Sequence, residues 1–260
     1  MVIGTLQQTV DEFKGITERE CLLDVNVSVF VKPLTPEEAI GTPGRRDFPI
    51  IIGKERVVEA NVRGSLGHAY TDSPQEFEGT VKDVLALNLT TNQNRAIYVA
   101  TLNAVLGHLK MVDKTVHCRD EEPEECAVEI AQSLFDKYGS VDVGLIGLNP
   151  AIAERLVETF GPEHVRITDL SKDNIGKKRF GVEVWDGATR TEDLVDASDV
   201  VLFTGTTLVN DTFAPILNRI QSQGKQYAVY GVTAAGTAKL FGIQRICPRG
   251  RNSTGCFTCS

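Results

Sequence analysis

The chain has 260 residues, 42% hydrophobic and 24% charged, which excludes a disordered protein and suffices for one large globular domain or two smaller ones. A formal charge of −8, with no basic cluster beyond Arg45–Arg46 and Lys177–Lys178, argues against a nucleic-acid partner. The start "MVIGTLQQTVDEFKG" resembles neither a secretory signal nor a transit peptide, and no apolar run approaches the ~20 residues of a membrane span. We therefore expect a cytoplasmic protein without a membrane partner, whose six cysteines are thiols.

The first half of the chain predicts strands followed by helices. Alternating or short β-type runs begin at three places: "DVNVSVFVKP" at Asp24, "FPIIIGK" at Phe48 and "RVVEANVRG" at Arg56. Helical patterns follow: "PQEFEGTVKDVLALNL" at Pro74, "NRAIYVATLNAVLGHLK" at Asn94 and "EPEECAVEIAQSLFDKYG" at Glu122, which ends at Gly139. An antiparallel meander and then helices indicate an α+β part.

After Ser140 the pattern changes to strands that alternate with helices. The strand "VDVGLIGL" precedes a helix in which Asn149 is the N-cap and Pro150 the first residue, and "HVRITDL" is the next strand. The pattern continues with helix "TEDLVDA", strand "VVLF", helix "DTFAPILNRIQSQG", strand "QYAVYGV", a small-residue turn "TAAGTAKLFG" and strand "IQRIC". Continuous apolar strands with crossovers predict a parallel sheet covered on both faces. We expect an α+β domain at 1–110, a helical link at 111–140 and an open α/β sheet domain at 141–260.

The stretch "DVVLFTGTTLVNDT" from Asp199 is a candidate binding pocket. Val200–Phe203 predicts a central parallel strand, and open α/β sheets bind ligands at the carboxyl ends of their strands. The residues at that end offer hydroxyls, a close backbone approach and a helix start: Thr204, Gly205, Thr206, Thr207, Asn210 and Asp211. The same residue types also turn a chain and cap a helix without any ligand.

The first βα turn, "GLIGLNP", lacks the G-x-G-x-x-G spacing, which argues against an ordinary dinucleotide site. Asp169 ends the second strand, where an acid in related folds takes a ribose hydroxyl, although a capping role fits equally well. Gly147, Asn149 and Asp169 together permit an adenosyl ligand. An S-adenosylmethionine-dependent methyltransferase therefore stays open as an alternative.

The stretch "RGSLGHAYTDSP" predicts a Gly-rich loop with two candidate proton carriers, His68 and Asp72. A lone histidine is more often structural, and Asp72 also suits the cap of the following helix. Asn103 lies on a helix face with small residues. It either reaches into an interdomain cleft or is a satisfied buried amide.

The C-terminal residues "CPRGRNSTGCFTCS" carry candidate metal ligands, Cys247, Cys256 and Cys259. A C-x-x-C pair can place two thiolates on one metal, with zinc or iron as the expected ion. A fourth ligand would come from His117, Cys118 or Cys126 if that loop folds back, from a partner subunit or from the bound molecule. A mobile tail with incidental thiols is the alternative.

The motifs "GHAYTD", "RAIYVATLNA" and "VVLFTGTTLVNDT", in this order, resemble the heavy-metal-chelation family, formerly a family of unknown function. The resemblance implies an enolase N-terminal-like domain followed by a Rossmann-like domain, with a ligand site between them. It also implies handling of a metal chelator or its precursor, of pterin, flavin or corrin type. The motif matches place these residues around the site: Gly67, Thr71, Asn103, Gly147, Asn149, Thr204, Gly205, Thr206, Thr207 and Asn210.

Two classes of function follow from these observations. One is an enzyme that acts on a small polar or anionic molecule in the cleft; the other is a non-catalytic carrier or sensor of a metal or ligand. We expect Gly205 to be essential for the pocket, so that Gly205→Val abolishes binding at little cost in secondary structure. We also expect a homodimer, because proteins with an interdomain cleft often associate in this way.

Overall fold

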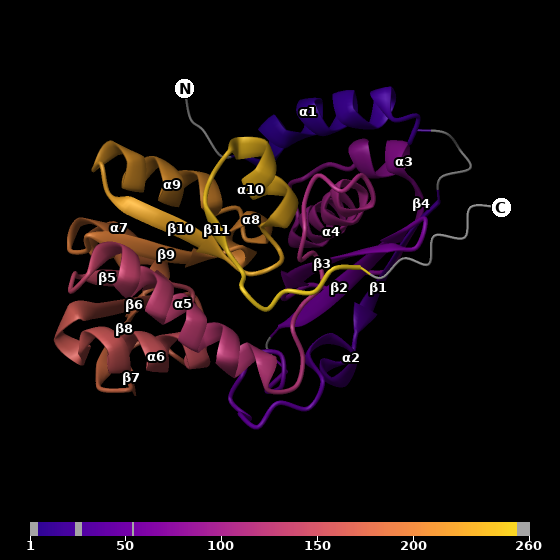
Figure 1. The fold of residues 1–260 in the computed structure, drawn as a ribbon. Coiled ribbons are helices and arrows are strands. Elements are labelled where there is room, and N and C mark those ends of the chain that lie inside the picture. The colour runs from indigo at the N-terminus through magenta and orange to yellow at the C-terminus, as the bar shows by residue number, and fades with distance from the viewer. Residues whose placement is uncertain (1–4, 24–27, 54, 254–260) are drawn as a thin grey trace.

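The computed structural model describes residues 5–23, 28–53 and 55–253 and contains two sheets (Figure 1). The helices are α1 (Leu6–Arg19), α2 (Pro36–Ile40), α3 (Val81–Leu85), α4 (Asn92–His108), α5 (Glu122–Tyr138), α6 (Pro150–Phe160), α7 (Gly187–Asp196), α8 (Thr206–Val209), α9 (Phe213–Ser222) and α10 (Ala235–Phe241). The strands are β1 (Ser28–Leu34), β2 (Arg56–Val62), β3 (Ser65–Thr71), β4 (Phe77–Thr80), β5 (Val143–Ile146), β6 (Val165–Asp169), β7 (Lys178–Arg179), β8 (Val182–Asp186), β9 (Val200–Thr204), β10 (Gln226–Tyr230) and β11 (Arg245–Ile246). A short 3-10 turn, η1 (Pro162–His164), precedes β6.

The first sheet is antiparallel, in the order β3-β2-β1-β4, and α4 covers one of its faces. Val57, Val58, Ala60 and Val62 of β2 are all buried, as expected for a central strand in a small sheet. Helix α4 is buried on all sides from Arg95 to Leu106, because it packs on β2 and β3 and also contacts α3, α8 and α10. This helix therefore joins the antiparallel sheet to the second half of the chain.

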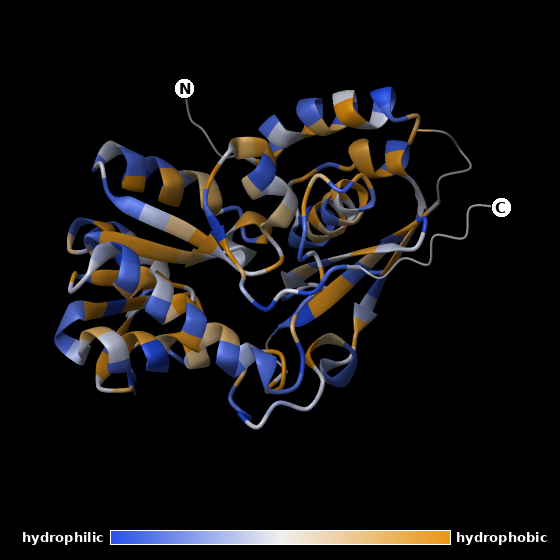
Figure 2. Cartoon of the chain, viewed as in Figure 1, coloured by the Kyte–Doolittle hydropathy of each residue, from blue (hydrophilic) through white to orange (hydrophobic). Residues whose placement is uncertain are grey.

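The second sheet has the order β11-β10-β9-β5-β6-β8-β7, and all pairs are parallel except β7 with β8. Side chains of β9 alternate between two cores: Leu202 packs with α5 and α6, whereas Val201 and Phe203 pack with α7 and α9. The sheet is thus covered on both faces, and Figure 2 shows mainly hydrophobic strands between helices with mixed surfaces. The predicted parallel α/β part is confirmed at this level.

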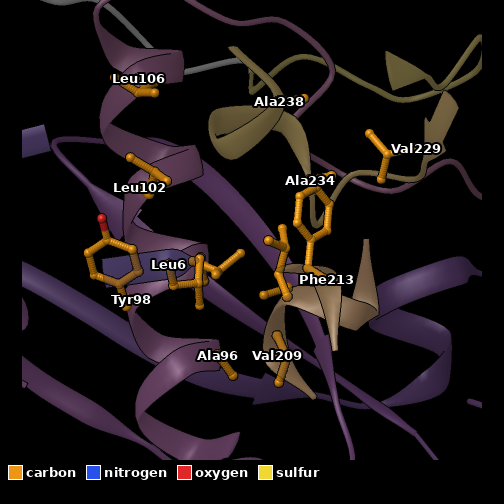
Figure 3. Packing of buried hydrophobic residues seen from close by; sticks show 14 of the residues in the cluster. Leu6, Ala96, Tyr98, Leu102, Leu106, Val209, Phe213, Val229, Ala234 and Ala238 are labelled. Carbon is orange, nitrogen blue, oxygen red and sulfur yellow. The ribbon is translucent and has the colours of Figure 1, made fainter. Parts of the chain in front are cut away.

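One hydrophobic core crosses from the first sheet to the second (Figure 3). Leu6 of α1 and Tyr98 and Leu102 of α4 belong to the same cluster as Phe213 of α9 and Ala234 before α10. Tyr98 also meets the ring of Phe13 edge-on at 5.9 Å, and its hydroxyl lies 2.7 Å from that of Thr9. The two sheets are therefore joined by a shared apolar core.

Three predicted elements differ in the structure. "FPIIIGK" forms turns rather than a strand, because Phe48 and Ile50 are anchored individually in the core. "SLGHAYT" is strand β3 rather than a loop, since its glycine is needed where β3 meets α4. "FEGT" forms edge strand β4 before the short α3, because pairing with β1 outweighs helix propensity.

Other elements were missing from the prediction. The turn expected at "TAAGTAKLFG" contains helix α10, whose small residues permit close packing on α4. The N-terminal helix α1, the short α2, and strands β7 and β8 were not predicted either. Among the described residues, no helix has both the length and the apolar character required to cross a bilayer.

Candidate functional site

A cleft of about 1130 Å³ opens at the carboxyl edge of the parallel sheet. One wall is made by the ends of β5, β6, β9 and β10, including Gly147, Asp169 and Thr204. The opposite wall comes from the first half of the chain, with Glu55, Tyr70 and others. The cleft thus lies where open α/β sheets bind ligands, and residues of both halves reach it.

The β5–α6 turn at the edge of the cleft is tightly closed. Gly147 has φ +87°, and a Cβ atom there would lie 2.6 Å from Cγ2 of Thr204. The Tyr230 hydroxyl donates to the Gly147 carbonyl at 2.9 Å, while Asn149 caps α6 by accepting from the Ile152 amide at 3.1 Å. Gly147 and Asn149 line the cleft as predicted, but both also have clear structural roles.

Asp169 lines the cleft with a carboxylate that already holds the surrounding loops. It accepts from the amides of Leu148 and Ser171, each at 2.7 Å, and from Asn174 Nδ2 at 3.2 Å. These donors fix the orientation of the carboxylate. The carboxylate therefore joins the β5–α6 turn to the segment after β6, as a capping aspartate would.

The residues at the end of β9 divide into those that line the cleft and Gly205, which does not. Thr204, Thr206, Thr207 and Asn210 line the cleft, with the Thr207 hydroxyl donating to the Thr204 carbonyl at 2.6 Å. Gly205 lies outside the lining, and a Cβ atom there would be 2.7 Å from the Ala234 amide nitrogen. Gly205→Val would thus disturb the packing of β9 on the 233–234 turn, which corrects the expectation of a selective effect on ligand binding.

Carboxyl groups approach the cleft from the antiparallel side. Burial and, to a smaller extent, the nearby carboxylates of Asp169 and Asp72 together raise the pKa of Glu55 to about 7. Asp72 is exposed and accepts from the Ser73 hydroxyl at 2.8 Å and from Asn92 Nδ2 at 2.9 Å. Burial also raises the pKa of Tyr70 well above its usual value.

His68, the other candidate proton carrier, is 2% exposed and does not line the cleft. Its Nε2 lies 3.0 Å from a Glu59 oxygen, and its Nδ1 accepts from the His117 amide at 3.2 Å. Burial lowers the pKa of His68 despite the neighbouring Glu59. With both ring nitrogens partnered inside the protein, His68 has the structural role that was the alternative expectation.

Three further predicted residues lie in what we call the α4 interface, the packed contact of α4 with β3, α8, α10 and residues 232–236. Asn103 is fully buried there: its Nδ2 donates to the carbonyls of His68, Val232 and Thr233, and its Oδ1 accepts from Gly236. Gly67 lets β3 approach α4, and Thr71 is buried, its hydroxyl accepting from the Ser73 amide. None of the three lines the cleft.

A cluster of sulfur and imidazole groups forms part of the wall, with His117, Cys118, Cys126 and Cys247. A hydrogen bond between the Cys126 thiol and Cys118, together with burial, raises the pKa of Cys126, and burial raises that of Cys247 to about 11. Cys118 Sγ lies 3.7 Å from His117 Nδ1. The segment with His117 lies beside the end of the chain that carries Cys247, as its bridge from Val116 to Arg251 shows.

The predicted metal ligands Cys256 and Cys259 lie outside the described residues. Within residues 5–23, 28–53 and 55–253, no group of three or more His, Cys, Asp or Glu side chains is arranged to hold a metal ion. Of the three predicted cysteine ligands, the described part of the chain contains only Cys247, and its described neighbours do not complete a metal site.

Several cleft residues were not anticipated from the sequence: Glu55, Tyr70, Arg179, Arg219 and Tyr230. Their local context gives little signal, because each stands in or near a strand or helix with ordinary periodicity. Only the rule that ligands bind at carboxyl strand ends favours Tyr230.

The chain is a mixed α/β protein in which two sheets share a hydrophobic core. Its cleft lies at the carboxyl edge of the parallel sheet, where proteins of this class bind ligands. Residues 130–246 match the model of the DUF364 family, described as "Putative heavy-metal chelation". The resemblance noted from the sequence motifs is thereby confirmed over this range. No curated protein matches the chain.

Two solved structures of similar fold come from the same family and are described as proteins with unknown function. The one from Desulfitobacterium hafniense DCB-2 is 14% identical, with 88% of this chain and 83% of that chain covered and a TM-score of 0.50. The one from Pyrococcus horikoshii is 16% identical, with 86% and 79% covered and a TM-score of 0.49. The comparison with the Desulfitobacterium hafniense structure supports the overall fold of this chain.

Proposed function

We propose that the protein binds a small polar molecule in the cleft, and that this molecule is a metal chelator, its precursor or a related cofactor. The observation that carries the proposal is the cleft itself. Its volume of about 1130 Å³ suits a cofactor-sized molecule, and side chains from both halves of the chain converge on it.

The chemistry of the lining supports a molecule with many polar groups. Thr206, Tyr230, Asn210 and Glu55 line one space and carry two hydroxyls, an amide and a carboxyl. These groups donate and accept hydrogen bonds in several directions, as recognition of a polyfunctional chelator requires. The family description, heavy-metal chelation, points to the same class of molecule.

An adenosyl ligand receives less support from the cleft. The Asp169 carboxylate is occupied by three protein donors, which leaves little capacity for a ribose. The Gly147 turn is closed by Tyr230 and Thr204, so that a phosphate or sulfonium group has no glycine-rich loop to enter. We therefore place the methyltransferase alternative second.

The finer fold classes belong to the same proposal. The antiparallel sheet with α4 is consistent with an enolase N-terminal-like domain, and the doubly covered parallel sheet with a Rossmann-like domain. The site between them would then be the one that this pairing of domains implies.

Extraction of protein purified under native conditions, followed by mass spectrometry of the released small molecules, tests the proposal. Asn210 lines the cleft, and Asn210→Trp would fill part of it, whereas Gln223→Trp adds the same ring at an exposed position. We expect a molecule that is present in the wild type and in Gln223→Trp and depleted in Asn210→Trp. Equal amounts in all three proteins, or no molecule in any of them, would contradict the proposal.

A further inference from the structure

Two side chains of opposite charge line the cleft without an ion-pair partner: Arg179 and Glu55. Within the described part of the chain, neither has an oppositely charged group within 4.0 Å, so they also do not pair with each other. Both are partly buried. Unpaired charges at such positions are unfavourable unless something else compensates them.

Arg179 shows this most clearly. Its Nη2 donates weakly to Asn174 Oδ1 at 3.4 Å, and its Nε is a buried atom without a hydrogen-bond partner. Arg219, the other arginine of the described lining, is neutralised by Asp196 at 2.5 Å and Glu192 at 3.7 Å. Arg179 therefore lines the cleft as a guanidinium whose charge no described carboxylate neutralises within 4.0 Å, which suits an oxyanion.

Glu55 is the counterpart on the opposite wall. Its carboxylate has no hydrogen bond among the described residues, and its nearest charged influences are the carboxylates of Asp72 and Asp169. Most other acids of the lining are already engaged by protein groups: Asp47 with Arg45, Asp193 with Arg190, Glu192 with Arg219, and Asp72 and Asp169 through hydrogen bonds. Glu55 is therefore the carboxylate that a cationic group of a ligand would satisfy.

We propose that the ligand of the cleft is zwitterionic, with a carboxylate or phosphate group held by Arg179 and an ammonium group held by Glu55. The inference rests on the proposed function and specifies the ligand class for the same site. A purely anionic molecule would be repelled by the surrounding acids and would offer Glu55 no cation to stabilise its ionised form. A bare metal ion would leave Arg179 uncompensated, and the described residues offer no set of three ligands for it.

Binding of simple probes tests the charge pattern directly. Linear ω-amino acids of increasing length are compared with diamines, dicarboxylates and diols of the same lengths, and inorganic phosphate serves as a second oxyanion source. Affinities are measured by ligand-observed NMR on the wild type, Arg179→Gln and Glu55→Gln. Lys178→Gln and Glu183→Gln are matched controls, since both side chains are exposed, lie in the same hairpin and are absent from the lining.

We expect an ω-amino acid to bind more tightly than the diamine, dicarboxylate and diol of equal length. Arg179→Gln should weaken the amino acid and the dicarboxylate by about tenfold or more, and Glu55→Gln should weaken the amino acid and the diamine to a similar extent. Both controls should bind as the wild type does. Loss of phosphate binding in Arg179→Gln would assign a phosphate to this position, and loss of dicarboxylate binding alone would assign a carboxylate.

Equal binding of the amino acid and the diol, or equal behaviour of Arg179→Gln and Lys178→Gln, would overturn the zwitterion. So would the absence of binding by every probe. The proposed function would still stand in those cases if a molecule co-purifies with the wild type and is lost in Asn210→Trp. Failure of both experiments would remove the site itself.

Discussion

The two halves of the chain meet in two ways, at the α4 interface and across the cleft. At the α4 interface, Gly67 lets β3 approach the backbone of α4, and Gly236 lets α10 approach the Leu102 side chain of α4. Asn103 has protein partners for both its amide nitrogen and its oxygen. Across the cleft, Glu55 and Arg179 have no charged partners within the described residues. A contact evolved for packing satisfies its polar groups internally, whereas a binding surface leaves some of them to the ligand.

Sequence patterns do not distinguish the packing residues of the α4 interface from the binding residues of the cleft. Glycine, threonine and asparagine serve close packing and ligand binding equally well, so Gly67, Asn103 and Gly205 were assigned to the site although they lie outside its lining. Mutations that separate stability from binding should distinguish the two regions.

The largest effect is expected for Gly67→Ala. The new Cβ would lie 2.3 Å from the Ala100 carbonyl oxygen and the Ala104 amide nitrogen, which are helix backbone atoms and cannot move locally. We expect a loss of about 3 kcal/mol or more in the free energy of unfolding, measured by urea denaturation. Gly15→Ala in α1, where the nearest atom is the flexible end of Arg19 at 3.4 Å, should instead stabilise by up to about 1 kcal/mol. Equal effects of the two substitutions would contradict the role of Gly67.

Asn103→Ala should follow, with a loss of about 3 kcal/mol in the free energy of unfolding. The substitution leaves the Gly236 amide and three carbonyls without their buried partner. Asn94→Ala in the first turn of the same helix, where the side chain bonds only the exposed Asn88 carbonyl, should cost less than about 1 kcal/mol. If Asn103→Ala keeps its stability but binds the probes more weakly, Asn103 contributes to ligand binding and not to packing.

Glu55 should make stability depend on pH. Its folded-state pKa of about 7 lies above the ordinary value of 4.5, so its favourable contribution is complete below about pH 4.5 and is lost as pH rises through about 7. The loss relative to Glu55→Gln is at most about 3 kcal/mol, because the side chain retains some solvent access. Urea denaturation of both proteins at about pH 5 and about pH 8 measures the difference and cancels most contributions of the facing groups Asp72, Asp169, Tyr70 and Tyr230. Parallel pH profiles would show that Glu55 is already paired.

The smallest effect on stability is expected for Asp72→Asn at the exposed rim of the cleft. Its partners Ser73 and Asn92 can rebond to the amide or to water, so the free energy of unfolding should change by less than about 0.5 kcal/mol. The substitution removes one negative charge near Glu55 and should lower the Glu55 pKa, as NMR titration can measure. An unchanged Glu55 pKa would mean that the Asp72 charge does not contribute to its value.

Some of the architecture was predictable because its signals are local. Asn149 followed by Pro150 marks a helix start in any context, and the structure begins α6 at Pro150 with Asn149 as its cap. The apolar runs of β5 and β9 likewise predict buried parallel strands whatever their partners. Elements stabilised by distant partners escaped prediction: β3 needs α4 beneath its glycine, and α10 needs α4 to cover its small residues.

The sequence by itself determined the α/β class, the change of pattern near Ser140, and a polar strand end at Thr204–Thr207. These features follow from periodicity and capping, which act over a few residues. Only the tertiary structure decided which polar residues line the cleft, and that Glu55 and Arg179 share it without an ion-pair partner in the described part of the chain. Burial and electrostatic environment depend on groups far apart in the chain, so a charged residue shows its role only when its spatial neighbours are known.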